Sequence, residues 1–171
     1  MPEKNGITSP FFREEVRPED RRAVGRLVRA TGFFSDEEID IAVDLVEERL
    51  ARGSASGYLF LFAEEADRLL GYTCFGPIPG SVHSFDLYWI AVDPQEQGRG
   101  VGRTLITSSE RIMAGCGARR LYAETSSRPQ YESTRAFYLA CGYREEAFLI
   151  DFYAPGDGKV IFSKSLPASA S

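Results

Sequence analysis

The segment Gln97-Gly98-Arg99-Gly100-Val101-Gly102-Arg103 constrains the fold of this chain of 171 residues more than any other feature. It lies between the β-rich run 84–92, which Asp93-Pro94 stops, and a stripe of apolar residues at helical spacing. Closely spaced glycines leave backbone N–H groups uncovered, and the start of a helix adds partial positive charge. This strand-turn-helix pattern predicts a phosphate site. The alternative is a glycine turn that serves only tight packing between strand and helix.

Two common phosphate-binding motifs do not match this segment. A dinucleotide-binding fingerprint needs G-x-G-x-x-G after a first strand, whereas the sixth position counted from Gly98 is Arg103 and the segment lies about 90 residues into the chain. A P-loop needs Lys followed by Ser or Thr, whereas Arg103-Thr104 follows Gly102 here, with a different loop length. The sequence therefore disfavours a dinucleotide-binding enzyme and a P-loop enzyme.

The remaining sequence predicts one α/β domain over residues 12–166, between a flexible N-terminus at 1–11 and a flexible tail at 167–171. Apolar spacing and end signals, including a capping box at Ser35 and Glu38, predict helices at 18–31, 36–52, 101–116 and 131–141. Short apolar runs predict strands at 12–16, 58–63, 69–75, 84–92, 121–125, 143–153 and 159–164. Hairpins combined with a strand-helix-strand unit indicate a mixed sheet.

Composition excludes several functional classes. With 43% apolar and 26% charged residues, the chain can bury a core of its own. The net charge of −5 and the lack of a basic run argue against a nucleic-acid partner. No apolar stretch approaches the length of a membrane span, and the N-terminus lacks an apolar signal region. We expect a cytoplasmic protein with neither a membrane nor a nucleic-acid partner.

Cysteine and histidine usage argues against a metal site. Cys74, Cys116 and Cys141 are too few and too scattered for a disulfide framework, and they form no CxxC pair. With a single histidine, His83, the chain cannot build a His-rich metal site. We expect His83 to be an exposed loop residue and Cys141 to be a small core residue.

Two blocks resemble the GCN5-related N-acetyltransferase (GNAT) superfamily. Its signature Gln/Arg-x-x-Gly-x-Gly/Ala is met by Gln97, Gly100 and Gly102. The block Ser133-x-x-Ala136-Phe137-Tyr138-x-x-x-Gly142-Tyr143 is similar to a later helix of the family, although Ser133 stands where Asn is usual. The order of elements agrees from about Arg13 to Lys164, so the resemblance covers most of the chain.

The resemblance implies a GNAT-like acyl-CoA N-acyltransferase fold, with a mostly antiparallel mixed sheet flanked by helices. It implies transfer of acetyl from acetyl-CoA to a primary amine of a small molecule or peptide, in a ternary complex and without a metal. The turn would hold the pyrophosphate through backbone N–H groups, and the preceding strand would splay and bind the pantetheine arm. The implied cofactor-binding residues are Ile90, Ala91, Val92, Gln97, Gly98, Arg99, Gly100, Val101, Gly102 and Arg103. Arg99 and Arg103 either bind phosphate or are solvated residues at a helix start.

Two acids and a tyrosine are candidates for proton transfer, because the amine must lose a proton and the leaving thiolate must gain one. Asp86 is the first candidate base: in a regular strand residues 86, 88, 90 and 92 share a face, and the resembling enzymes often carry an acid here. Asp86 could instead bind local backbone or attract a cationic acceptor, and Glu124 is the alternative base. Tyr138 matches the family's tyrosine near the CoA sulfur, although a core tyrosine would give the same sequence.

Aromatic and acidic residues predict the acceptor wall. Phe33 and Phe34 lie in the loop that walls the acceptor site in the resembling fold, or else they form a hydrophobic staple before Ser35. Further lining could come from Phe85, Tyr88, Asp151 and Tyr153. Such a wall suits a small cationic amine or a peptide N-terminus, and a homodimer is left open. The rival hypothesis is a non-catalytic CoA-binding sensor or partner module, which needs the turn but neither Tyr138 nor an acid.

Overall fold

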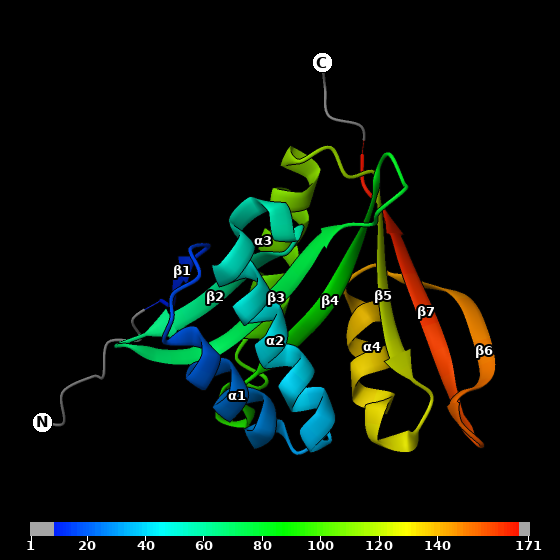
Figure 1. Cartoon of the computed structure of the whole chain (residues 1–171). Helices are drawn as coiled ribbons and strands as arrows, with labels where there is room; N and C mark the ends of the chain where they lie inside the picture. The colour runs from blue at the N-terminus through cyan, green and yellow to red at the C-terminus, as the bar shows by residue number, and fades with distance from the viewer. Residues whose placement is uncertain (1–8, 168–171) are drawn as a thin grey trace, which may run out of the picture.

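Seven strands form one sheet in the order β1-β2-β3-β4-β5-β7-β6 in the computed structural model, which describes residues 9–167 (Figure 1). The β4–β5 pair is parallel and the other neighbours are antiparallel, so the predicted mixed, mostly antiparallel sheet is confirmed. The strands are β1 Phe11–Arg13, β2 Leu59–Glu65, β3 Arg68–Pro77, β4 Ser84–Val92, β5 Arg120–Ser126, β6 Arg144–Ala154 and β7 Asp157–Ser165.

Helices cover both faces of the sheet (Figure 1). They are α1 Asp20–Thr31, α2 Asp36–Arg52, α3 Val101–Gly115 and α4 Glu132–Ala140, with the short 3-10 helices η1 Gly53–Ser56, η2 Pro94–Glu96 and η3 Pro129–Tyr131. Helices α1 and α2 bury a core against β2 and β3 that includes Val28 and Phe62. On the other face, α3 and α4 bury a second core that includes Leu105 and Phe162. Within residues 9–167, no helix has both the length and the apolar character that a membrane crossing requires.

The expected end signals of the first two helices are present. Gly32 ends α1 in the left-handed region with φ 72°, where glycine has no Cβ to clash. Ser35 caps α2: its hydroxyl accepts the N–H of Glu38 at 3.2 Å, and the Glu38 carboxylate accepts the N–H of Ser35 at 2.8 Å. The first strand was expected at 12–16 but spans Phe11–Arg13. The rest of the predicted flexible ends, 1–8 and 168–171, lies outside the described residues.

Strand β4 contains a β-bulge at Tyr88. Cys74 and Phe75 are consecutive in β3, yet they pair with Trp89 and Leu87, so Tyr88 is the extra residue. The bulge reverses the alternation of side chains along β4. As a result, side chains before and after it that are two or four residues apart no longer share a face.

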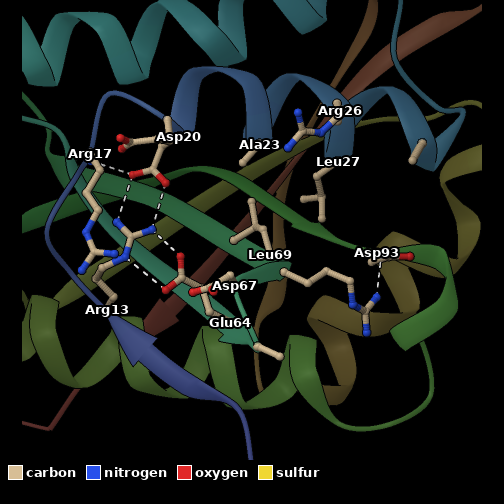
Figure 2. A pocket seen from close by; sticks show the side chains of 14 residues that line it. Arg13, Arg17, Asp20, Ala23, Arg26, Leu27, Glu64, Asp67, Leu69 and Asp93 are labelled. Carbon is tan, nitrogen blue, oxygen red and sulfur yellow. Dashed lines mark hydrogen bonds and ion pairs between the residues drawn. The ribbon is translucent and has the colours of Figure 1, made fainter.

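Arg13 joins β1, α1 and β2 through a buried ion-pair cluster (Figure 2). Its guanidinium donates to both carboxylate oxygens of Asp20, at 2.8 and 2.9 Å, and to Glu64 at 3.2 Å. It also lies 4.4 Å from the ring centroid of Phe62. The cluster borders a cavity of about 650 Å³ whose lining comes mainly from β1, α1 and the β2–β3 turn, so this cavity does not lie between β4 and β5.

We expect Arg13→Ala to lower the free energy of unfolding by about 3–5 kcal/mol, because Asp20 is buried and would lose its cation. Urea unfolding followed by circular dichroism measures the change. Arg17→Ala is the matched control, since that side chain is exposed and lies 3.9 Å from its partner Glu15, and we expect it to cost less than about 1 kcal/mol. Equal losses in the two variants would show that the cluster contributes no special stability.

Candidate active site

A wedge opens between β4 and β5, the two parallel strands at the centre of the sheet. They pair only through Ser84–Leu87 and Arg120–Ala123, although β4 continues to Val92 and β5 to Ser126. Figure 1 shows the strands adjacent near the top of the view and separating below. Beyond the paired segment, the backbone N–H and C=O groups that each strand directs toward the other are therefore not paired between β4 and β5.

The glycine turn lies at the open end of the wedge, between β4 and α3. Gly98 and Gly100 adopt φ angles of 77° and 84°, and a Cβ at either position would meet no atom within 4 Å. Gly100 is the N-cap of α3, and the first N–H groups of a helix have no intrahelical acceptor. In the described part of the chain, no side chain accepts the N–H groups of Val101, Gly102 or Arg103. Left-handed glycines, open space and free donors are the features with which a backbone turn can bind phosphate.

Gly102, on the first turn of α3, lies close to both β4 and α4. A Cβ on Gly102 would lie 3.5 Å from Val92 at the end of β4 and 3.5 Å from Phe137 on α4. Of the other predicted cofactor residues on β4, Ile90 packs beside Val92 against the α3 core, and Ala91 is buried in the opposite core. The structure thus brings the end of β4, the start of α3 and the helix that carries Tyr138 together.

The two arginines of the turn already have partners in this structure. Arg99 and Arg68 both donate to the buried carboxylate of Glu96, each at 2.5 Å. These hydrogen bonds, led by the one from Arg68, hold the pKa of Glu96 below its usual range. Arg103 donates to the carbonyl of Ala140 at the C-terminal end of α4, at 3.3 Å. Glu96 was not predicted from the sequence, because a single acid in a loop gives no sign of being buried between two arginines.

Tyr138 lies on the inner face of α4 and is 4% exposed. Its ring packs at 5.5 Å from the ring of Tyr143 and 5.4 Å from that of Phe162. Burial, with a smaller contribution from Cys141, raises the pKa of Tyr138 well above its usual range. The hydroxyl therefore carries its proton at neutral pH. Left-handed Gly142 ends the helix, as predicted.

Asp86 and Glu124 lie on the opposite side of the sheet from Tyr138, on the face that α1 and α2 share. Asp86 is half-buried, and its pKa is raised to about 6 by burial and by the negative charge of Glu124, against a lowering by Lys159. Glu124 is exposed and forms an ion pair of 2.6 Å with Lys159. The two candidate bases thus differ in environment: Asp86 is half-buried, and Glu124 is exposed and paired with the ammonium of Lys159.

The expectation that Asp86 shares a face with Ile90 and Val92 is wrong. The bulge at Tyr88 leaves Asp86 and Tyr88 toward α2, while Ile90 and Val92 turn toward α3. The sequence pattern assumed a regular strand, and the extra residue breaks the period of two. Asp86 nevertheless stays at the point where β4 and β5 separate, since it pairs with Tyr122.

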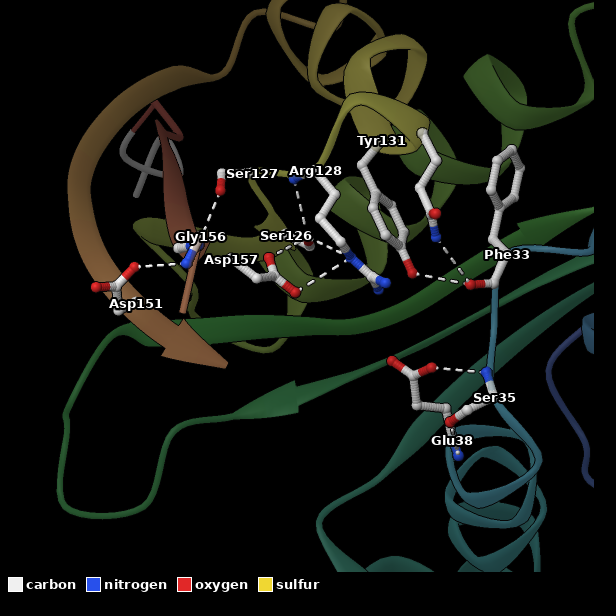
Figure 3. A network of polar contacts seen from close by, with 12 residues as sticks. Phe33, Ser35, Glu38, Ser126, Ser127, Arg128, Tyr131, Asp151, Gly156 and Asp157 are labelled. Carbon is white, nitrogen blue, oxygen red and sulfur yellow. Dashed lines mark hydrogen bonds and ion pairs between the residues drawn. The ribbon is translucent and has the colours of Figure 1, made fainter. Parts of the chain in front are cut away.

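The loop between α1 and α2 bridges the mouth of the wedge (Figure 3). The carbonyl of Phe33 accepts hydrogen bonds from the hydroxyl of Tyr131 at 3.1 Å and from the amide of Gln130 at 3.3 Å. The ring of Phe33 lies 5.9 Å from that of Tyr131, and Phe34 packs 4.9 Å from Trp89. Both phenylalanines therefore contact the elements around the wedge, which a staple before Ser35 alone would not require.

Phe85 is not part of the acceptor wall. It is 5% exposed and packs in the core beneath α3, so the expectation for this residue is wrong. The period of two separated the faces of β4 correctly on this side of the bulge, but it did not tell which face α3 covers. Tyr88 lies on the other face, edge-on to Tyr58 at 5.4 Å.

Strand β6 arches away from β7 beside the wedge. Leu149 pairs with Lys159 and Ala154 pairs with Asp157, which leaves four residues of β6 facing one residue of β7. Asp151 sits in the arch with φ 52°, and its carboxylate accepts the N–H of Gly156 at 2.8 Å (Figure 3). Asp151 therefore stabilises the turn between β6 and β7. Tyr153 lies within the electrostatic influence of Glu124: burial and the negative charge of Glu124 raise the pKa of Tyr153 to about 12.

Two further residues match their expected structural settings. His83 is exposed, and its Nδ1 lies 3.0 Å from the carbonyl of Gly117. Cys141 is buried, and burial raises the pKa of its thiol. Neither residue lies among those that border the wedge.

Comparisons with known proteins decide the family. The sequence profile of the acetyltransferase (GNAT) family matches residues 21–143. The chain belongs to the GNAT family of acetyltransferases. A GNAT-family structure from Desulfovibrio desulfuricans is similar with a TM-score of 0.90 and 44% identity, covering 92% of this chain and 99% of that one. Comparison with curated protein sequences finds no match.

Two N-acetyltransferase structures in complex with coenzyme A share the fold. An aminoglycoside 6'-N-acetyltransferase complexed with coenzyme A has a TM-score of 0.74 at 19% identity, covering 94% of this chain and 99% of that one. The PaiA N-acetyltransferase from Thermoplasma acidophilum, in complex with coenzyme A, has a TM-score of 0.69 at 20% identity, covering 91% and 99%. The predicted GNAT membership and the predicted α/β fold are confirmed.

Proposed function

We propose that this GNAT protein is an acetyl-CoA-dependent N-acetyltransferase that transfers acetyl directly to a primary amine of a small molecule or peptide. The observation that carries the proposal is the arrangement around the wedge. A turn with free N–H donors lies at its open end, a protonated tyrosine lies on one side of the sheet, and a sheltered carboxylate lies on the other. These are the three parts that a direct transfer needs.

The turn fits the pyrophosphate of CoA on the geometry of this chain. Gly98 and Gly100 leave open space, and the first N–H groups of α3 point out of the helix start. The stretch of β4 that contains Ile90, Ala91 and Val92 pairs with β3 but not with β5. Its backbone groups on the β5 side would hold the pantetheine arm. When bound, acetyl-CoA supplies the acetyl group as a thioester.

Two residues move protons in the proposed reaction. The Asp86 carboxylate accepts a proton from the acceptor amine, directly or through a water molecule, so that the nitrogen lone pair becomes available. The Tyr138 hydroxyl donates a proton to the sulfur that leaves. Phe33, Phe34 and Tyr88 line the approach of the amine. Nearby acids outnumber cations, which favours a cationic acceptor.

A screen of primary amines with acetyl-CoA, read by the release of free thiol, tests the proposal directly. We expect at least one small amine or peptide N-terminus to give release above the rate of hydrolysis. If the protein binds CoA but no amine in the screen raises thiol release above the rate of hydrolysis, the protein is the non-catalytic module instead.

We expect Gly100→Val to raise the dissociation constant of CoA about 10-fold to 100-fold, measured by calorimetry. A valine at φ 84° is strained, and its side chain would project into the open space where phosphate is proposed to bind. Gly117→Val is the matched control, because Gly117 has φ 91° and equally open space but follows the far end of α3. A folded Gly100→Val variant with unchanged CoA affinity would contradict the assignment of the turn.

A further inference from the structure

Three charged side chains form a diagonal across one face of the sheet. Asp86 on β4 pairs with Tyr122, and Glu124 lies two residues further along β5 on the same face. Lys159 on β7 is displaced by two residues from Ile161, the partner of Glu124. Residues displaced by two across neighbouring strands are within reach of long side chains. The backbone register alone therefore places Asp86, Glu124 and Lys159 in a row that runs from the point where β4 and β5 separate toward the end of β5.

The ammonium of Lys159 is enclosed where this row ends. Its Nζ lies 2.6 Å from the Glu124 carboxylate, 3.9 Å from the ring centroid of Phe152 and 5.8 Å from that of Tyr153. The side chain of Lys159 is only 13% exposed. The arch of β6 brings both rings over it. A carboxylate and two aromatic faces around one ammonium hold that cation in place.

The two acids of the row are held differently as a result. Glu124 has a cation at hydrogen-bond distance, whereas no side chain or backbone group within residues 9–167 donates a hydrogen bond to the Asp86 carboxylate. A carboxylate that must take a proton from a substrate has to be ionised, yet not occupied by a donor of the protein. Of the two acids, Asp86 meets that condition.

We propose that Lys159 is a positioning residue that separates the roles of the two acids: it occupies Glu124 as an ion-pair partner and keeps Asp86 ionised and free to accept the proton of the amine. This assignment rests on the proposed N-acetyltransferase function. It goes beyond that function by choosing between the two candidate bases and by adding a third residue, far along the chain, to the acceptor side.

The charges that face Asp86 fix the direction of each expected change. Glu124 on β5 and Lys159 on β7 act on it with opposite sign, while Tyr88 on β4, whose pKa is raised to about 12 chiefly by burial, is neutral below that pH. Loss of Lys159 should therefore raise the pKa of Asp86 above about 6, and loss of Glu124 should lower it.

Carbon-13 NMR of the Asp86 carboxyl, assigned by its absence in Asp86→Asn, measures this pKa without any ligand. We expect the titration midpoint to rise by roughly half a unit to one unit in Lys159→Met and to fall by a similar amount in Glu124→Gln. Lys159→Arg should keep the midpoint near that of the wild type, because it retains the charge beside Glu124. Lys164→Met is the matched control, since Lys164 pairs with Glu110 on the other face of the sheet, and it should leave the midpoint unchanged.

Unchanged midpoints in both Lys159→Met and Glu124→Gln would overturn the assignment, and Glu124→Gln alone still tests it if Lys159→Met does not fold. With butylamine as the acceptor, the acid limb of kcat/KM should move in the same direction as each midpoint. A limb that follows neither variant would also overturn the assignment. If the midpoints move as stated but no amine in the screen releases thiol from acetyl-CoA, the proposed function fails on its own.

Discussion

Asp86→Asn is expected to lower turnover at pH 7 by about 100-fold or more, with part of the loss recovered as the pH rises. An alkyl ammonium has a pKa of about 10.4, so only about one acceptor molecule in 10³ carries a free amine at neutral pH. The wild-type carboxylate, with a pKa of about 6, is ionised there and can take the proton. In the variant that route is absent, and the rate should follow the concentration of free amine.

Turnover between pH 5 and 9.5, measured on both forms with saturating acceptor, separates a base from a charge that only attracts the acceptor. A base lowers kcat when it is removed, whereas a purely electrostatic contact raises KM and leaves kcat little changed. Glu124→Gln is the comparison variant, and we expect a much smaller loss from it. Parallel pH profiles with equal saturating rates for wild type and Asp86→Asn would remove Asp86 as the base and return the role to Glu124.

Loss of stability cannot account for the expected loss in Asp86→Asn. Because the folded-state pKa of Asp86 is raised, the folded protein binds a proton more tightly than the unfolded chain between the usual carboxyl pKa and about 6. The contribution of Asp86 to stability is therefore greatest below this window and falls as the pH rises through it. At neutral pH the ionised group is disfavoured in the fold, so the neutral asparagine should be tolerated.

Tyr138→Phe has the second large expected effect, a fall in kcat of about 100-fold with little change in the KM for the acceptor. The substitution keeps the ring that packs against Tyr143 and Phe162 and removes only the hydroxyl. Single-turnover measurements of thiol release, under conditions where chemistry limits the rate, give the relevant constant.

Tyr143→Phe is the matched control for that experiment. Tyr143 is 3% exposed, its hydroxyl has no hydrogen-bond partner among residues 9–167, and its ring touches that of Tyr138. Removal of this hydroxyl should leave turnover within a few-fold of wild type. Near-native turnover in Tyr138→Phe as well would make Tyr138 a packing residue, and the proton for the sulfur would have to come from solvent.

The parts of this protein that were predicted from sequence are those that local signals determine. The helix ends at Gly32 and Ser35, and the glycine turn before Val101, each follow from the conformational preferences of a few adjacent residues. The strand runs followed from short apolar stretches in the same way. Family membership added the connection between the turn and Tyr138, which lie on different elements.

The parts that were not predicted depend on pairing between strands. The bulge at Tyr88 arises from the register of β4 against β3, and it reversed the face assigned to Asp86. Phe85 was misplaced because an alternating pattern gives two faces without telling which one a helix will bury. The ion pair of Lys159 with Glu124 joins β7 to β5 beside the arch in β6. No local sequence pattern predicts a contact between strands that are far apart in the chain. The roles of the site residues, the cytoplasmic location and the oligomeric state stay predictions.

The short contact between β4 and β5 means that few hydrogen bonds connect the two halves of the sheet. Only four residues of each strand carry the ladder from one half of the sheet to the other, and the loop at Phe33 crosses the opposite end. A ligand whose polar groups form hydrogen bonds with the unpaired edges of both β4 and β5 would connect the two strands. The free energy of unfolding would therefore rise with the fraction of protein that has ligand bound. Ligand at 100 times its dissociation constant adds about 2.7 kcal/mol to the free energy of unfolding. On the proposed function, the short ladder between the two central strands is therefore also the place where bound acetyl-CoA would strengthen the sheet.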